Sequence, residues 1–184
     1  MEVKHNYGPF LIIVPMSTLH NNWEFECDRW LPNIAKVVYD GDKDKRRHLR
    51  ENFIKPGKFN IVMTTYEFAM RDKSTLRKIP WQYIIIDEAH RLKNSSCKLA
   101  QELSTYPKES RRVALTGTPL QNELHELWSL LNFLHPSIFQ SADSFEKCAS
   151  NAPHSAQQEG WSISRWLFSV CLIISRVAPL FLSL

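Results

Sequence analysis

The sequence predicts an α/β fold built on a mainly parallel sheet, and two observations lead to this prediction. Five short apolar segments, each too short for a helix, recur along the chain at residues 10–14, 37–39, 59–64, 84–86 and 112–115. The stretches between them have the apolar spacing of helices, and strands that alternate with helices form parallel sheets with right-handed crossovers. At 184 residues the chain is long enough to bury one sizeable core of this kind.

Composition limits the class of protein. Apolar residues make up 43% of the chain and charged residues 23%, which is ordinary for a globular protein and excludes a disordered one. The net charge of +4 permits a polyanionic partner without requiring one. Four cysteines stand far apart with no C-x-x-C pair, which argues against a zinc site or a disulfide framework and fits a reducing compartment. The first ten residues contain no apolar segment of the secretory type.

The first predicted strand, Phe10–Val14, ends at Pro15 and leads into a predicted helix. Apolar residues at helical spacing predict that this helix packs on the sheet; they are Leu19, Trp23, Trp30 and Leu31. Ser17 and Thr18 suit its N-cap. Hydroxyls and free N–H groups at a helix start also bind phosphate. Ser17 therefore has two interpretations, and the residues alone favour ordinary capping over contact with a nucleic-acid backbone.

The second predicted strand, 37–39, leads through the turn Asp40-Gly41 into a helix crowded with cations. These cations are Lys43, Lys45, Arg46, Arg47 and Arg50, and Leu49 and Phe53 form the apolar face of the helix. Because Asp40, Asp42 and Asp44 are interleaved with the cations, the residues favour a solvated helix face over a nucleic-acid site.

The third predicted strand, 59–64, runs into the sequence TTYE at Thr64–Glu67, which the residues alone predict to be a strand-to-helix turn. The polar helix that follows at 71–78 ends at Ile79-Pro80, before the next strand.

The fourth predicted strand, Ile84–Ile86, is followed at once by Asp87 and Glu88. A parallel strand buried on both faces delivers such residues to the carboxyl edge of the sheet, where open α/β proteins bind ligands. An Asp at this position can hold Mg²⁺ on a nucleotide, and an adjacent Glu can orient or deprotonate the attacking water. The alternative is a pair of acids that start a helix, since the positive end of the helix dipole favours them.

The fifth predicted strand, 112–115, runs into the sequence TGTPLQN at 116–122. Thr116, Gly117 and Thr118 place hydroxyls beside a backbone that glycine allows to turn sharply, which suits contact with a phosphate-bearing neighbour. The clearest predicted helix follows at 123–134, and another is predicted at 92–103. None of the five glycines begins a G-x-x-x-x-G-K-[ST] phosphate loop.

Four strings in this order resemble motifs of the Swi/Snf-type remodelling ATPases of helicase superfamily two. The strings are VPMSTLHNNW for motif Ia, TTYE for motif Ib, DEAH for motif II and LTGTPLQN for motif III. Asn21-Asn22 gives the first string one residue more than the motif it resembles. The resemblance covers roughly residues 8–145 and comes closest to the imitation-switch (ISWI) group. It implies a RecA-like fold, namely a partial first helicase lobe without its opening strand and phosphate loop.

The resemblance also implies a role for each motif. Asp87 would bind Mg²⁺ through water, Glu88 would activate the hydrolytic water, and His90 would lie at the ATP site. Coupling between the nucleotide and the DNA would fall to Thr116, Gly117, Thr118 and Gln121. The segments that face DNA would contain Pro15, Ser17, Thr18, Thr64, Thr65 and Tyr66.

The implied activity is ATP-dependent translocation along double-stranded DNA. ATP and Mg²⁺ are the implied cofactors, nucleosomes with their histones and remodelling-complex subunits are the implied partners, and the nucleus is the implied location. Motif I and the second lobe with its arginine finger are missing, and such a finger contributes about 10³ to 10⁵ in rate. We therefore expect the chain alone to hydrolyse ATP negligibly. A non-catalytic fragment that binds DNA or a partner is the alternative.

The resemblance divides the chain into a partial ATP-binding lobe at 1–150 and an apolar C-terminal tail at 151–184. A membrane helix needs about 20 predominantly apolar residues. The run from 166 to 184 is interrupted by Arg176 and followed closely by Pro179, and a charge near mid-span costs about 2.5 to 3.5 kcal/mol. We expect an aberrant or alternative chain end here, ahead of a helix that covers apolar surface and of a membrane anchor.

Overall fold

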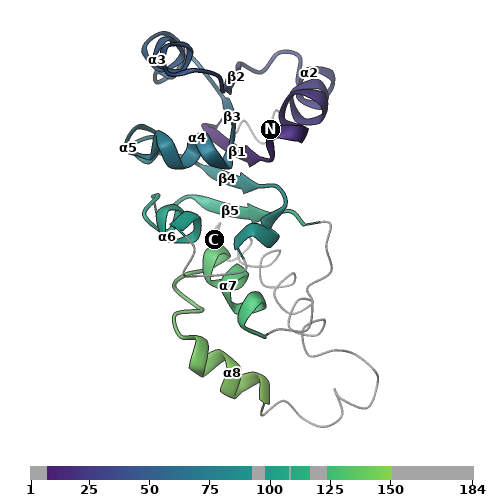
Figure 1. Cartoon of the computed structure of the whole chain (residues 1–184), viewed down its shortest axis with the longest axis vertical. Coiled ribbons are helices and arrows are strands. Elements are labelled where there is room, and N and C mark those ends of the chain that lie inside the picture. The colour runs from purple at the N-terminus through teal and green to yellow at the C-terminus, as the bar shows by residue number, and fades with distance from the viewer. Residues whose placement is uncertain (1–7, 93–97, 108, 117–123, 151–184) are drawn as a thin grey trace, which may run out of the picture. The chain divides into compact units, whose positions relative to one another are not determined.

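The computed structural model describes residues 8–92, 98–107, 109–116 and 124–150 (Figure 1). The chain divides into two compact units, the first made of residues 1–89 and 96–117 and the second of residues 90–95 and 118–184.

The first unit is built on a five-stranded sheet in which every pairing is parallel. Its strands are β1 (Phe10–Val14), β2 (Lys36–Tyr39), β3 (Ile61–Thr65), β4 (Tyr83–Ile86) and β5 (Arg111–Ala114), and their order across the sheet is β2-β3-β1-β4-β5. The predicted α/β fold is confirmed. All five predicted strands are present with small shifts at their ends, as for β3, which begins at Ile61 instead of Phe59.

The central strand β1 fixes the register of its neighbours. Phe10 lies opposite Ile61 of β3 and Tyr83 of β4, so these three residues share one face of the sheet. Every residue of β1 is buried, as expected of a parallel strand that is covered on both faces.

Helices cover the sheet in two groups on opposite sides (Figure 1). The group between β1 and β2 consists of α1 (Met16–Thr18), the π-helix η2 (Leu19–Glu24) and α2 (Phe25–Trp30). The group on the other side consists of α3 (Lys43–Asn52), α4 (Tyr66–Arg71), α5 (Lys73–Leu76) and α6 (Lys98–Ser104). Right-handed crossovers produce this division, because the chain leaves β1 toward one edge of the sheet and afterwards moves toward the other. The carboxyl end of β1 is therefore a topological switch point, where sheets of this type bind ligands.

The apolar cluster beneath η2 and α2 forms the core on one face of the first unit's sheet. Its buried members are Phe10, Ile12, Val14, Leu19, Cys27, Ile34, Ile61 and Met63, and Trp23 and Leu31 pack against them. The predicted packing of this helix on the sheet is confirmed, but the prediction is wrong for Trp30, which is 70% exposed. Trp30 is the last residue of α2, and its indole N–H donates to the exposed side of the same helix, to Glu26 at 2.6 Å.

The cationic helix α3 is confirmed, with Asp42 as its N-cap accepting from the backbone N–H of Lys45 at 2.7 Å. The prediction of its buried side is wrong. Phe53 is 47% exposed, whereas Arg46 is buried at 6% exposure. An acceptor on the neighbouring segment makes this burial possible, because Arg46 Nε donates to Asp72 at 2.7 Å.

The start of the helix predicted at 92–103 lies in the 3-10 helix η3 (Ala89–Leu92), and its end lies in α6. Residues 93–97 lie outside the described part of the chain.

The second unit contains α7 (Leu124–Leu134) and α8 (Ala142–Ser150), and α7 confirms the predicted helix at 123–134. Leu127, Leu131 and Phe145 form its buried cluster. Within the residues that the structure describes, no helix is both long and apolar enough to span a bilayer. The predictions for 151–184 fall outside these residues.

Candidate functional site

Asp87, Glu88 and Ala89 form a short turn at the carboxyl edge of the sheet, directly after β4. Strands on both sides hold this turn. The backbone N–H of Asp87 donates to the carbonyl of Ile13 at 2.9 Å, and that of Ala89 donates to the carbonyl of Leu115 at 2.8 Å. The turn is therefore fixed to β1 on one side and to the segment after β5 on the other.

The two oxygens of the Asp87 carboxylate each accept a hydrogen bond from the protein. Oδ1 accepts from the backbone N–H of Glu88 at 2.9 Å, and Oδ2 accepts from the indole N–H of Trp23 at 2.9 Å. These two donors fix the orientation of the carboxylate. Because a carboxylate oxygen has more than one lone pair, each oxygen can still accept from a water or bind near a cation.

Glu88 has an unusual backbone conformation, with a φ of 52° in the left-handed region. For a residue with a side chain, such a conformation costs on the order of 1 to 3 kcal/mol and persists only where the surroundings enforce it. The hydrogen bonds of Asp87 and Ala89 on either side enforce it here. Strain of this kind clusters at functional sites, and no feature of the sequence predicts it.

Tyr66 connects the start of α4 to the same turn. Its hydroxyl donates to the carbonyl of Asp87 and also lies 3.4 Å from the carbonyl of Glu88. The side chain is 7% exposed. The hydroxyl of Tyr66 is thus directed into the protein, toward the candidate site.

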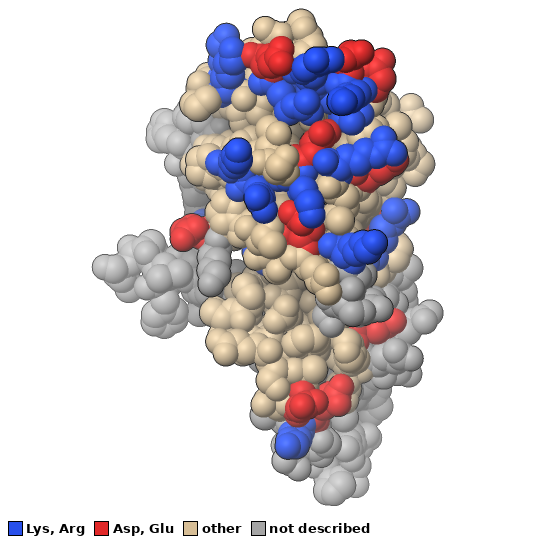
Figure 2. Space-filling view, turned by 60° about the vertical axis from the view of Figure 1, so that its left-hand side comes forward, with Lys and Arg blue, Asp and Glu red and all other residues tan. Residues whose placement is uncertain are grey.

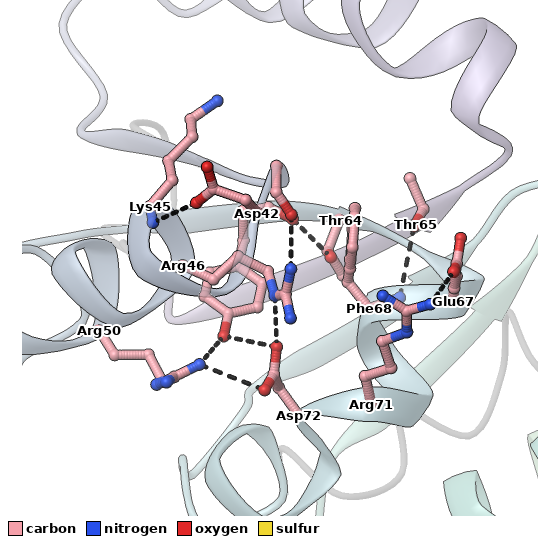
Figure 3. Close-up of polar contacts among 12 residues, drawn as sticks. Asp42, Lys45, Arg46, Arg50, Thr64, Thr65, Glu67, Phe68, Arg71 and Asp72 are labelled. Carbon is pink, nitrogen blue, oxygen red and sulfur yellow. Dashed lines mark hydrogen bonds and ion pairs between the residues drawn. The ribbon is translucent and has the colours of Figure 1, made fainter.

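Thr64 and Thr65, at the end of β3, also use their hydroxyls inside the protein (Figure 3). Thr64 is fully buried and donates to the carbonyl of Tyr39 at 2.8 Å, and Thr65 caps α4 by accepting from the backbone N–H of Phe68 at 3.4 Å. Contact between these residues and DNA stays a prediction, and neither residue offers it more than 4% of its surface.

The segment Pro15–Thr18 begins the helical stretch that covers the core. The N-cap of α1 is Pro15, and no side chain caps this helix, so the preference for Ser17 as a cap is wrong. The reason is that the helix begins at Met16, which leaves Ser17 inside it. Ser17 is exposed, and none of the described residues hydrogen-bonds to its hydroxyl. Thr18 instead donates to the carbonyl of Pro15 at 3.1 Å.

The π-helix η2 contains Asn21 and Asn22, the position at which the sequence has one residue more than motif Ia. A π turn holds one residue more than an α turn between hydrogen-bonded groups, so the helix accommodates the extra residue without breaking. Trp23 follows within this turn, where its ring packs on the core and its N–H reaches Asp87.

Thr116 follows Leu115, whose backbone is hydrogen-bonded to Ala89 and to Ile86. The start of the TGTPLQN sequence and the Asp87–Glu88 turn therefore lie together at one edge of the sheet. Gly117, Thr118 and Gln121 fall outside the described residues. His90 belongs to the second unit, so its role at the ATP site stays a prediction.

A polar network joins α3 to the junction of α4 and α5 (Figure 3). Asp72 accepts hydrogen bonds from Arg46 Nε at 2.7 Å and from the hydroxyl of Tyr39 at 2.9 Å, and it forms an ion pair with Arg50 at 3.2 Å. Burial would lower the pKa of Arg46, but the carboxylate of Asp72 outweighs burial and raises it. The network ties the end of β2 and helix α3 to the junction of α4 and α5.

Lysine and arginine side chains gather on the face of the first unit formed by α3 to α6 (Figure 2). Several of them are ion-paired, as Lys45 is with Asp40 at 2.6 Å and Lys73 with Glu102 at 2.8 Å. Two of the interleaved acids, Asp40 and Asp44, thus pair with cations of α3. Lys43 and Lys78 are exposed, and the described residues offer no acid within ion-pair distance of either amine. This face, which we call the basic face, suits contact with a polyanion.

Sequence reasoning identified Asp87 and Glu88 but missed Trp23 as a polar contact of the site. Trp23 lies within the motif Ia string, and its apolar spacing pointed only to the core. An indole ring has a single polar atom that finds a hydrogen-bond partner when buried, which is the signal that could have identified it.

Comparison with known proteins finds one matching domain family and relatives with similar sequences. The chain matches the SNF2-related domain over residues 1–175. It is 51% identical over 159 residues to the ATP-dependent helicase brm of Drosophila melanogaster and 48% identical over 145 residues to the nuclear protein STH1/NPS1 of Saccharomyces cerevisiae. These alignments cover 86% and 79% of this chain but only 10% of each relative.

A solved structure with the same fold is the Sulfolobus solfataricus SWI2/SNF2 ATPase core in complex with double-stranded DNA. The TM-score is 0.68 at 30% sequence identity, over 92% of this chain and 33% of that one. The predicted RecA-like architecture is therefore confirmed.

Proposed function

The chain belongs to the SNF2-related domain family, and on this premise we propose that it forms part of the first ATPase lobe of a motor that translocates along double-stranded DNA and remodels nucleosomes. The observation that supports this most is the Asp87–Glu88 turn, which lies beside Thr116 and is hydrogen-bonded to Trp23 and Tyr66. Two segments with proposed DNA contacts thus reach a carboxylate pair at the ligand-binding edge of the sheet.

Within the family, brm and STH1/NPS1 favour a relationship to the brm and SNF2 type over the imitation-switch group that the sequence suggested. The name of STH1/NPS1 as a nuclear protein supports the nucleus as the location. Nucleosomes, histones and remodelling-complex subunits are the partners that we propose for the whole protein.

The donor set at the edge of the sheet fits Mg²⁺ that arrives with ATP. Mg²⁺ on a nucleotide is usually bound by one or two carboxylates together with phosphates and waters. Asp87 offers one oriented carboxylate, and the described residues contain no group of three or more His, Cys, Asp or Glu that could hold a metal alone. The bound ion would neutralise charge on the phosphates.

Each carboxylate of the turn then has a separate role. Asp87, held by two N–H donors, would orient a water on Mg²⁺ through its remaining lone pairs. Glu88 would orient the attacking water and accept its proton. Residues Thr116–Thr118, with Gln121 and His90, would respond to the phosphates and pass their state to the DNA-facing segments.

Contact with DNA is supported by two surfaces. Ser17 presents an exposed hydroxyl at the start of a helical stretch, where hydroxyl and backbone N–H groups bind phosphates. The basic face adds cations such as Lys43 and Lys78, which have no acid partner among the described residues and can neutralise a DNA backbone.

Turnover of ATP would need groups that this chain does not supply. No glycine in it begins a phosphate loop, and it spans 33% of the solved ATPase core. We therefore propose that the chain alone hydrolyses ATP negligibly. This feature also favours the second candidate function, a non-catalytic module that binds DNA or a remodelling partner.

The ATPase rate of the intact protein that carries this chain, measured with and without duplex DNA, distinguishes the two functions. A motor is expected to exceed about 1 s⁻¹ with DNA, and Glu88→Gln is expected to abolish that rate while DNA binding remains. Turnover that Glu88→Gln leaves unchanged contradicts the proposed site. DNA binding without any turnover by the intact protein supports the binding module instead.

A further inference from the structure

The hydrogen bond from Trp23 to Asp87 joins two residues that are 64 positions apart in the sequence. The ring of Trp23 packs against the apolar cluster of the first unit, while its N–H points to Asp87 Oδ2 at 2.9 Å. Because the core fixes the ring and the indole has a single polar atom, Trp23 acts as a rigid donor with one possible direction.

The indole N–H of Trp23 matters because it restrains the terminal torsion of the Asp87 side chain. The terminal torsion of an Asp side chain is broad, so the carboxylate plane is not fixed by rotamer preference. The N–H of Glu88 on Oδ1 and that of Trp23 on Oδ2 together define the plane. Without the N–H of Trp23, only the hydrogen bond from the N–H of Glu88 remains, and the Asp87 carboxylate can rotate about its terminal torsion.

The same donor stands on the π turn that begins two residues after Ser17. The turn η2 spans Leu19–Glu24, and π turns inside helices are frequent at functional sites. A ligand that shifts or tightens this turn changes the distance between the indole and Oδ2. Trp23 therefore links the exposed Ser17 segment, which lies shortly before it in the chain, to the Asp87 carboxylate.

We infer that Trp23 is a positioning residue that orients the Asp87 carboxylate and couples the Ser17 segment to the magnesium–nucleotide site. This inference rests on the proposed function. Residues that orient metal-binding carboxylates typically affect metal affinity or activity about 10- to 100-fold when replaced. Coupling between two binding sites is reciprocal, so DNA and Mg–nucleotide alter each other's affinity by the same factor.

The test measures equilibrium binding of a fluorescent ADP to the intact protein at varied Mg²⁺, with and without duplex DNA. Trp23→Phe keeps the ring in the core and removes the N–H. We expect it to raise the Mg²⁺ concentration for half-saturation about 10-fold and to abolish the effect of DNA on that concentration. Trp30→Phe is the matched control, because Trp30 is 70% exposed and donates to Glu26. It is expected to match the wild type in both respects.

A spectroscopic readout on the wild type makes the test independent of how well Trp23→Phe folds. Indole ¹H–¹⁵N resonances are assigned by single Trp→Phe replacements, and the Trp23 resonance is expected to shift on addition of Mg–ADP and in Asp87→Asn. The shift in Asp87→Asn verifies the hydrogen bond, and the shift on addition of Mg–ADP is the response that a merely structural tryptophan does not give. A resonance that stays in place, or a Trp23→Phe protein with the wild-type dependence on Mg²⁺, overturns the inference and leaves the proposed function standing. A wild-type protein that binds no Mg–ADP overturns both.

Discussion

Arg46 of α3 donates its Nε hydrogen to Asp72 at 2.7 Å, and its guanidinium lies 4.6 Å from the ring centroid of Phe68. An arginine with 7% side-chain exposure therefore holds α3 against the junction of α4 and α5. Two different contacts, one charged and one aromatic, compensate its burial.

Replacing Arg46 with Met is expected to lower the free energy of unfolding by about 2 kcal/mol, because a hydrogen bond between charged groups is lost. Asp72 keeps the Tyr39 hydroxyl and Arg50 as partners, which limits the loss. Urea unfolding of the chain measures the change. Arg47→Met is the control, since Arg47 is exposed and its pair with Asp44 lies on the surface. Equal effects of the two replacements would mean that burial of Arg46 contributes nothing.

The difference between these neighbouring arginines marks the limit of what the sequence could predict. The strands were predictable, because runs such as Ile84–Ile86 are apolar and too short for a helix. The position of Asp87 at the sheet edge followed from that strand. Burial of Arg46 was not predictable, since it depends on Asp72, which is distant in the sequence.

The candidate site also has features that the sequence predicts and features that it does not. Asp87 and Glu88 follow from the strand that precedes them, whereas the left-handed φ of Glu88 and the Trp23 bond arise from packing between distant segments. Ser17 was misjudged because the sequence does not reveal that the helix begins one residue before it. Local patterns predict elements, and contacts across the sheet decide which side chains reach the site.

His20 predicts a dependence of stability on pH. Its Nδ1 lies 2.6 Å from Glu24 and its Nε2 lies 2.7 Å from Asp40, and hydrogen bonds to these two carboxylates raise the pKa of His20 above 6.5. Because the folded-state pKa is the higher one, this stabilisation is fully present below pH 6.5 and is lost as the pH rises through the raised pKa.

Replacement of His20 with Gln is therefore expected to lower the free energy of unfolding at pH 5.5 but to have little effect at pH 8.5. The side chain is 47% exposed, which limits the loss to less than about 1 kcal/mol. Urea titrations at the two pH values measure it. His48→Gln serves as the control, because the ring of His48 is hydrogen-bonded to Asn52 and not to a carboxylate. A loss that is the same at both pH values contradicts the assignment.

Tyr66→Phe removes the hydroxyl that donates to the carbonyl of Asp87. A lost hydrogen bond of this kind costs about 1 kcal/mol of stability, and the turn that carries Asp87 and Glu88 becomes less constrained. We expect the intact protein to lose DNA-stimulated ATPase activity while its affinity for DNA is retained. In the control Tyr83→Phe, the lost hydroxyl bonds to the exposed Arg111, so activity should be preserved. Weakened DNA binding by Tyr66→Phe would instead assign the hydroxyl to the DNA contact.

Lys43 and Lys78 test the basic face. If both amines contact phosphates, the double replacement with Gln reduces the slope of log affinity against log salt by about 2, since each contact contributes about 0.9. DNA binding by the intact protein is measured across a salt series. Lys45→Gln with Lys73→Gln is the matched control, because these amines are paired with Asp40 and Glu102. A slope that the Lys43 and Lys78 replacements leave unchanged excludes this face from the DNA contact.

Ser17 and Thr64 separate two kinds of proposed DNA contact. Ser17→Asp places a negative charge at an exposed position where a phosphate is proposed to bind. A like charge at such a contact costs on the order of several kcal/mol. We therefore expect the affinity of the intact protein for DNA to fall at least 10-fold, while the free energy of unfolding changes little. Thr64→Val removes a buried hydroxyl that donates to Tyr39, so it should reduce stability by about 1 kcal/mol and leave DNA affinity intact. Because Thr64 is fully buried, its hydroxyl is not available to DNA, and Thr64→Val tests the internal hydrogen bond alone. Binding and unfolding measurements on both variants check the pair of expectations, and a Ser17→Asp protein with wild-type affinity removes motif Ia from the DNA interface.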